Sequence, residues 1–259
     1  MRNSSASKSE LIVMTSTVIV PVINTDVMRN NLESRLNDVL RAIKSWALFT
    51  EKTSRSLVLI ENSGSVKLIY KYLPSEYRRK IMLIEAPEDT KSTEQGISAG
   101  EYGMIQFLID NYDIKKHSFI WKISGRNYCP NARKIISWDG NADIVATRNS
   151  SPAHFVNTRL FGMKPEVLKE FGEGNICFSR KDETDRGKCF SSMEHYMTQF
   201  VLDQEVRGRR QVDFVKIPRF TGFSGSTNKI IDSKKRRLFL ILLNPFRRLI
   251  VKLLAGNTP

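Results

Sequence analysis

FIWKISGRN, from Phe119 to Asn127, has the pattern of a buried strand that ends in a polar, glycine-containing turn. Large apolar residues surround Lys122, and the turn Ser124 to Asn127 then interrupts the run. In α/β proteins, ligands bind at the carboxyl ends of the strands. Lys122 and Arg126 at such a strand end favour a phosphate-bearing ligand, because Arg can grip phosphate oxygens with two hydrogen bonds and Lys acts as a point charge.

Segments with the pattern of strands alternate with segments of helical pattern along the rest of the chain. Short apolar runs predict strands over 18–23, 56–64, 80–85, 119–124, 142–147, 158–163 and 214–218. Helices are predicted over 27–49, 66–73, 100–112, 131–138 and 191–204, and Pro165 marks the start of another. This alternation predicts a single α/β domain with a mostly parallel central sheet.

The composition is that of a globular protein with an anionic partner. At 259 residues, 41% of them hydrophobic, the chain can bury a substantial core, which excludes a disordered chain. Its formal net charge of +14 favours nucleic acid, an anionic membrane or a phosphorylated substrate. About half of that excess lies in residues 229–252, where eight Lys/Arg accompany one acid, Asp232. The abrupt change predicts a domain of residues 1–228 and a basic tail of residues 229–259.

The tail SKKRRLFLILLNPFRRLIVKLL places six apolar residues, Leu238 to Leu243, between two clusters of cations. This run is too short to span a bilayer. It suits an amphipathic helical tail that lies on an anionic membrane surface through residues 234–254. The alternative is a C-terminal helix that docks on the core.

The cysteines and histidines indicate neither disulfides nor a metal. Three cysteines without a CxxC pair fit a reducing compartment, and three histidines without zinc spacing argue against a zinc site. With the basic tail, these features predict a cytoplasmic protein that is peripheral on the cytoplasmic face of the inner membrane.

Three predicted strand ends, 21–26, 61–64 and 122–127, are expected to meet at the carboxyl edge of the sheet. The acidic and amide groups after the second strand suit hydrogen bonding to a base or a ribose, and Gly125 lets the backbone approach a ligand closely. The candidate ligand-binding residues at this edge are Pro21, Asn24, Glu61, Asn62, Ser124 and Gly125. Alternatively, the two cations of the last strand end snorkel or pair with Glu61 or Glu85.

The order of VIVPVI, LVLIENSG and QGISAGEYGM along the chain resembles glycosyltransferases of the GT-A type. KISGRN is similar to the K-[IL]-[ST]-G-R-Y signature of bacterial glycosyltransferases that build capsule or lipopolysaccharide glycans, and TRLFGMKPEVLKEF and RFTGFSGST also resemble segments of that group. The resemblance covers residues 17–228. It implies a Rossmann-like GT-A domain that binds a nucleotide-sugar donor and transfers a hexosyl or related group to a lipid-linked glycan acceptor.

One departure from the GT-A pattern concerns the metal. Most GT-A enzymes carry Asp-x-Asp at the end of the strand that FIWKIS would occupy, where the carboxylates hold Mn²⁺ or Mg²⁺ on the diphosphate. This sequence contains no Asp-x-Asp. Lys122 and Arg126 are expected to neutralise the leaving diphosphate instead, so that neither a divalent metal nor another cofactor is required.

Glu194 is the candidate general base for the acceptor hydroxyl, since GT-A enzymes often present an acid from the start of a late helix. The alternative is a capping box with Ser191, and a retaining enzyme would need no base. Glu101 is expected to bind the donor sugar or to cap its own helix. Ser224 and Ser226, in a Gly/Ser loop, are expected to close over the donor phosphates, unless this segment is a linker to the tail.

Two other functions fit the sequence less well. Nucleic-acid binding agrees with the net charge, but the cations gather beside an apolar run and do not interleave with aromatic residues. A nucleotidyltransferase that makes nucleotide-sugars would carry a glycine-rich, basic loop directly after the first strand. That place holds VINTDVMRNN, without glycine.

Overall fold

The computed structural model describes residues 9–20, 30–53, 55–87, 95–137, 140–148, 156–174, 176–178, 189–190 and 192–222. Several predicted features lie outside these ranges. They are Pro21, Asn24, Ser191, Ser224, Ser226 and the basic tail of residues 229–259.

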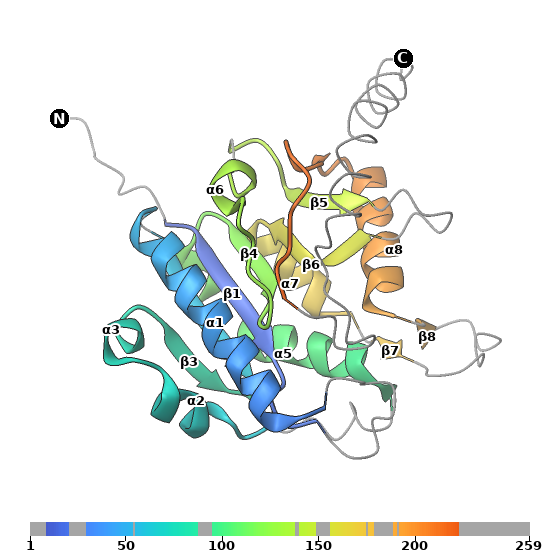
Figure 1. The fold of residues 1–259 in the computed structure, drawn as a ribbon. Coiled ribbons are helices and arrows are strands. Elements are labelled where there is room, and N and C mark those ends of the chain that lie inside the picture. Colours follow the sequence, from blue (N-terminus) through green and yellow to red (C-terminus); the bar gives the residue numbers. More distant parts are fainter. Residues whose placement is uncertain are drawn as a thin grey trace, which may run out of the picture.

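The described strands form a seven-stranded sheet in the order β3-β2-β1-β4-β6-β5-β9 (Figure 1). Their bounds are β1 Leu11–Ser16, β2 Ser56–Glu61, β3 Met82–Glu85, β4 Ile120–Ser124, β5 Ile144–Arg148, β6 Val156–Met163 and β9 Gln211–Val212. β6 is antiparallel to β4 and β5, and the remaining pairs are parallel. β7 (Cys177–Phe178) and β8 (Cys189–Phe190) form a separate parallel pair. The structure thus confirms the predicted α/β class and mostly parallel sheet.

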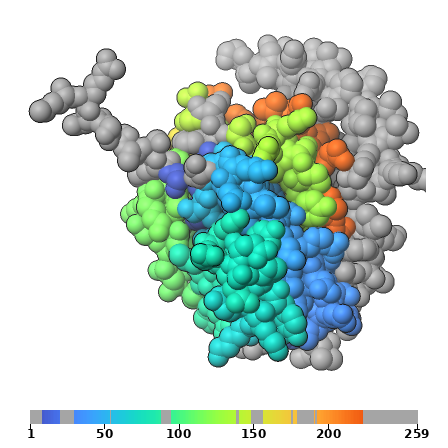
Figure 2. All heavy atoms as spheres, turned by 60° about the vertical axis from the view of Figure 1, so that its left-hand side comes forward, coloured from blue at the N-terminus to red at the C-terminus, as the bar shows by residue number. Residues whose placement is uncertain are grey.

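Helices cover both faces of the sheet, because both faces are apolar. The helices are α1 Leu32–Glu51, α2 Val66–Tyr72, α3 Ser75–Arg78, α5 Ile97–Asn111, α6 Ala132–Ile135, α7 Pro165–Gly172 and α8 Met193–Val206, with a 3₁₀ turn at Ile114–Lys116. One buried cluster joins α1, α2 and α6 to the sheet, and a second joins α5, α7 and α8 to its other face. Figure 2 shows α1 (blue) beside α2 and α3 (teal) on the first side.

The first strand lies seven residues earlier than predicted, over Leu11–Ser16 and not 18–23. Both runs are apolar, but all six residues of β1 are buried and pair with β2, and Leu11 to Thr15 also pair with β4. The N–H of Val18 leaves the ladder and donates to the Glu61 carboxylate at 3.0 Å.

The last predicted strand, 214–218, is also wrong, since the ladder is made by β9. Phe214 packs against Trp121 with 6.1 Å between ring centroids, and the carbonyl of Ile217 accepts a hydrogen bond from Asn131 Nδ2 at 3.0 Å. Residues 214–218 are therefore held by the ring of Phe214 and by the hydrogen bond from Asn131, and they do not pair in the sheet.

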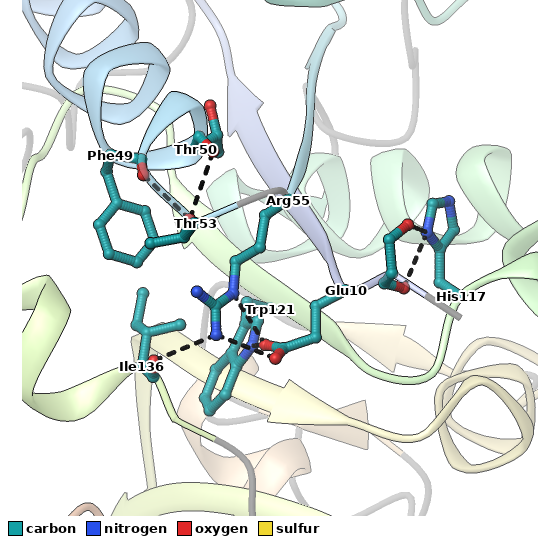
Figure 3. A network of polar contacts seen from close by, with 9 residues as sticks. Glu10, Phe49, Thr50, Thr53, Arg55, His117, Trp121 and Ile136 are labelled. Carbon is teal, nitrogen blue, oxygen red and sulfur yellow. Dashed lines mark hydrogen bonds and ion pairs between the residues drawn. The ribbon is translucent and has the colours of Figure 1, made fainter. Parts of the chain in front are cut away.

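A charged network closes the amino-terminal edge of the sheet (Figure 3). Glu10 accepts two hydrogen bonds from Arg55, at 3.0 and 2.9 Å, and a third from Trp121 Nε1 at 2.6 Å. These groups satisfy one another's hydrogen bonds and so stabilise this edge of the sheet.

Candidate functional site

The carboxyl ends of β1, β2 and β4 lie side by side, which confirms the prediction for the second and third of the expected strand ends, whereas the first, 21–26, lies outside the described residues. Ser16 pairs in register with Glu61, and Thr15 pairs with Ser124. The predicted segments 61–64 and 122–127 are thus brought to one edge, and the loop that enters α1 starts from the same place.

Glu61 holds the loops after β1 and β2 together. Its Oε1 accepts from the Val18 N–H at 3.0 Å and from the Ser63 hydroxyl, and its Oε2 accepts from the N–H groups of Ser63 and Ser65 at 2.9 and 2.8 Å. The side chain is fully buried. The prediction that Glu61 contacts a base or ribose does not fit this geometry, because its oxygens already serve four donors.

Asn62 continues this framework next to Glu61. Its Oδ1 accepts from the Thr17 hydroxyl at 2.6 Å, and the Thr17 carbonyl in turn accepts from Arg35 Nε at 3.0 Å. Arg35 comes from the first turn of α1, which Asn31 caps by accepting from the Ser34 N–H at 2.9 Å. The predicted ligand-facing residues Glu61 and Asn62 therefore shape the edge of the sheet from within.

Gly125 is required by its close contact with β1. Its N–H donates to the Thr15 carbonyl at 2.8 Å, and a Cβ at this position would lie 2.7 Å from that oxygen and 2.9 Å from Ser16 Cβ. This contact explains the glycine from within the fold, and its predicted role in the approach of a ligand stays a prediction. Ser124 and Arg126 are half-buried on either side of it.

The segment that ends at Gly222 lies against the KISGRN turn. Tyr128 and Thr221 form a β-bridge, and the Thr221 N–H donates to the Tyr128 carbonyl at 2.9 Å. Gly222 has φ of +133°, and a Cβ there would lie 2.7 Å from Asn127 Nδ2. Thr221 and Gly222 therefore lie at this edge.

Some buried polar atoms at this edge make no hydrogen bond within the described residues. Among them are Ser16 Oγ, at the end of β1, and Asn127 Nδ2, in the KISGRN turn. Buried polar groups are nearly always hydrogen-bonded. Both atoms are closed off from solvent, so an ordered water or a change of conformation would have to bring them a partner.

Lys122 was predicted to lie at the carboxyl edge of the sheet, but its side chain does not reach that edge. Its side chain is 2% exposed, it forms an ion pair with Glu101, and its ammonium donates to the Thr158 carbonyl at 2.9 Å. The expected contact with a leaving diphosphate does not fit an ammonium enclosed by α5 and β6. The alternative of pairing with Glu61 or Glu85 is also not observed, since the carboxylate partner is Glu101.

Glu194 lies in the first turn of α8 and turns toward β6. Its Oε1 accepts from the Thr158 hydroxyl at 2.9 Å. The N-cap of α8 is Ser192, whose hydroxyl accepts from the His195 N–H at 3.2 Å, so the alternative of a capping box with Ser191 is wrong. Glu101 does not cap α5 either, because it lies in the second turn of that helix and binds Lys122.

The sequence reasoning missed Thr158, which contacts Lys122 through its carbonyl and Glu194 through its hydroxyl. It stands first in TRLFGM, a segment that was predicted as a strand and noted for its resemblance, with no role given to Thr158. Nothing in that pattern shows which residue of β6 faces the carboxylates, because this depends on the antiparallel register with β4.

The described part of the chain shows neither a candidate metal site nor a candidate membrane-spanning helix. It contains no group of three or more His, Cys, Asp and Glu side chains placed to hold a metal ion. None of its helices combines the length and the apolar character needed to cross a membrane.

No protein-family model and no curated protein matches the chain. Among solved structures it is similar to the galactosyltransferase LgtC in complex with donor and acceptor sugar analogues, with 10% identity and a TM-score of 0.47 over 73% of this chain and 69% of that one. It is also similar to Drosophila β1,4-galactosyltransferase 7, with 8% identity and a TM-score of 0.44 over 88% and 73% of the two chains. A glycosyltransferase involved in glycosylation of the major capsid of PBCV-1 matches with 11% identity and a TM-score of 0.43 over 79% and 81%. At these identities and TM-scores the matches assign neither a family nor an activity to this chain.

Proposed function

We propose that this chain is a glycosyltransferase that moves a sugar from a nucleotide-sugar donor to a glycan acceptor at the carboxyl edge of its sheet. The observation that carries the proposal is the meeting of Glu101 and Glu194 beside the end of β4. They come from two helices far apart in the sequence and are joined through Lys122 and Thr158. Partly exposed carboxylates next to a ligand-binding edge suit general-base chemistry.

In this proposal Glu194 accepts the proton of the acceptor hydroxyl while the acceptor oxygen bonds to the anomeric carbon. The bond from that carbon to the donor phosphate breaks, and the nucleoside diphosphate leaves with the electron pair. Glu101 lies close enough to the same cluster to bind hydroxyl groups of the donor sugar. Hydrogen-bond acceptors placed where a proton must leave contribute about 10²–10⁴-fold to such reactions.

In this proposal the nucleotide-sugar donor binds at the carboxyl edge of the sheet. Arg126, in the turn after β4, would neutralise the leaving diphosphate, with Ser124 beside it and Ser224 and Ser226 from the segment that follows Gly222. Pro21 and Asn24 would contact the nucleotide from the connection between β1 and α1. We propose that no divalent metal is needed, since the sequence has no Asp-x-Asp.

The acceptor is proposed to be a lipid-linked glycan of the cell surface, such as a capsule or lipopolysaccharide precursor. The support is the charge of the tail, where eight Lys/Arg accompany one acid in residues 229–252. Each cation near an anionic membrane surface adds about 1 kcal/mol of attraction. The chain would then work at the cytoplasmic face of the inner membrane, bound through residues 234–254.

The first test is calorimetric binding of UDP, GDP, CMP and dTDP, in EDTA and then with Mn²⁺. We expect one nucleotide to bind in EDTA, and Arg126→Ala to weaken its binding at least about tenfold, as loss of a charged hydrogen bond predicts. Arg79→Ala, at the exposed end of α3, is the matched control and should bind like the wild type. Binding only with Mn²⁺ would contradict the metal-free donor site, and no binding under either condition would refute the proposed function.

A further inference from the structure

Lys122 is a buried cation on an otherwise apolar face of the sheet. It shares this face with Ile120, and its register partners are Val13 on β1 and Phe161 on β6, both part of the buried cluster beneath α5 and α8. Its ammonium lies 5.7 Å from the centre of the Phe161 ring. Burying a charge costs free energy unless it is paired and hydrogen-bonded, so a lysine here must be held by specific partners.

The partners of Lys122 join four elements in one chain of polar contacts. Glu101 on α5 pairs with the ammonium, and the Thr158 carbonyl on β6 accepts a hydrogen bond from it at 2.9 Å. The Thr158 hydroxyl then donates to Glu194 Oε1 on α8 at 2.9 Å. A single residue of β6 thus links the buried ammonium to the second carboxylate.

The helices that carry the two carboxylates are also tied to each other. The N–H of Met193, at the start of α8, donates to Ser98 Oγ in the first turn of α5 at 3.0 Å. The backbones around Glu101 and Glu194 are therefore fixed, and the orientation of the two carboxylates is left to Lys122 and Thr158.

We propose that Lys122 and Thr158 are positioning residues, which hold Glu101 and Glu194 in the orientation needed for catalysis and do not themselves bind the donor. This inference rests on the proposed glycosyl transfer and gives Lys122 a role other than contact with the diphosphate. Thr158 engages Oε1 of Glu194, so Oε2 is the oxygen that receives the proton of the acceptor hydroxyl.

The electrostatics of the cluster agree with this role. Burial lowers the pKa of Lys122 from 10.5 to about 7, the charge of Glu194 opposes this change, and the charge of Arg159 on β6 adds to it. Glu101 faces the same ammonium from α5. When Lys122 loses its proton, the cation between the two carboxylates is lost, so the positioning is expected to weaken as the pH rises through neutrality.

The test uses the full chain and the nucleotide-sugar whose nucleotide binds in the calorimetric screen. Turnover is measured as release of nucleoside diphosphate with water as the acceptor. Thr158→Val removes the hydroxyl that holds Glu194, whereas Thr158→Ser keeps it and is the matched control. We expect Thr158→Val and Lys122→Met to lower kcat about tenfold or more, with nucleotide Kd within about twofold of the wild type and Thr158→Ser close to the wild type. A tenfold rise in nucleotide Kd for Lys122→Met with kcat unchanged, or a wild-type kcat for Thr158→Val, would overturn the inference.

A second readout does not depend on transfer. The Lys122 ammonium is followed by NMR of lysine Nζ across pH in the wild type and in Glu194→Gln. We expect removal of the Glu194 charge to shift this titration to lower pH, because that charge favours the protonated lysine. An unchanged titration would refute the coupling even if transfer occurs. If no donor turns over but the titration shifts as expected, the proposed function fails and the linked cluster stands.

Discussion

Replacing Glu61 by Gln tests whether this residue organises the edge of the sheet. The carboxylate accepts four hydrogen bonds, two on each oxygen, from the loops after β1 and β2. An amide of the same shape keeps one oxygen and presents an NH₂ group on the other side, where the Ser63 hydroxyl can turn to accept from it but the Val18 N–H cannot, so at least one hydrogen bond is lost. Each bond to a charged group contributes about 1.5–3 kcal/mol, which predicts a loss of at least about 1.5–3 kcal/mol in the free energy of unfolding.

The assay is urea unfolding at neutral pH, followed by circular dichroism, with Glu76→Gln as the control. Glu76 is an exposed acid in the first turn of α3, and its replacement should change the free energy of unfolding by less than about 0.5 kcal/mol. If Glu61→Gln also stays within about 0.5 kcal/mol of the wild type, the carboxylate does not hold the two loops, and a direct role in ligand binding would again have to be considered.

Three further predictions use the same urea assay. Gly125→Ala should lose about 1–3 kcal/mol, since its Cβ would lie 2.7 Å from a β1 carbonyl oxygen, and a wild-type midpoint would contradict that close approach. Gly162→Ala should lose at least as much, because its Cβ would lie 2.3 Å from the Phe119 ring and 2.6 Å from the Trp121 ring; an unchanged midpoint would mean that these rings can move aside. Burial lowers the pKa of Lys122 from 10.5 to about 7, so between these two pH values the unfolded state holds the lysine proton and the folded state does not. The stability of the wild type relative to Lys122→Met should therefore rise with pH in that window, by at most about 1.4 kcal/mol per pH unit. A pH-independent difference would show that Lys122 keeps its ordinary proton affinity.

The sheet was predictable because its strands are apolar on both faces and helices separate them. The register of the first strand was not predictable, because LIVMTS and VIVPVI are both apolar and lie almost end to end. In the structure the Val18 N–H donates to the Glu61 carboxylate and not to the backbone of a neighbouring strand. That contact joins residues 43 positions apart and leaves no local signal.

The sequence singled out some members of the cluster but not how their side chains meet. Lys122 came from the pattern of its strand, and Glu101 and Glu194 came from the resemblance to GT-A enzymes; the structure joins the three through one cluster. Strand alternation decides which face of the sheet receives Lys122, and a sequence does not show which face the later helices cover. For the same reason the link through Thr158 was invisible until β6 was placed antiparallel to β4.

The bridge between Tyr128 and Thr221 has a practical consequence for work on this protein. Because it fastens the chain at the carboxyl edge, a truncation after Gly222 would leave a new terminal carboxylate next to Asn127. A negative charge at that point would compete with any phosphate that binds there, and the cut would also remove Ser224 and Ser226, so weak nucleotide affinity of a shortened protein would have two causes. The amino end avoids this difficulty, since the chain enters the fold beside Glu10, on the far edge of the sheet (Figure 3).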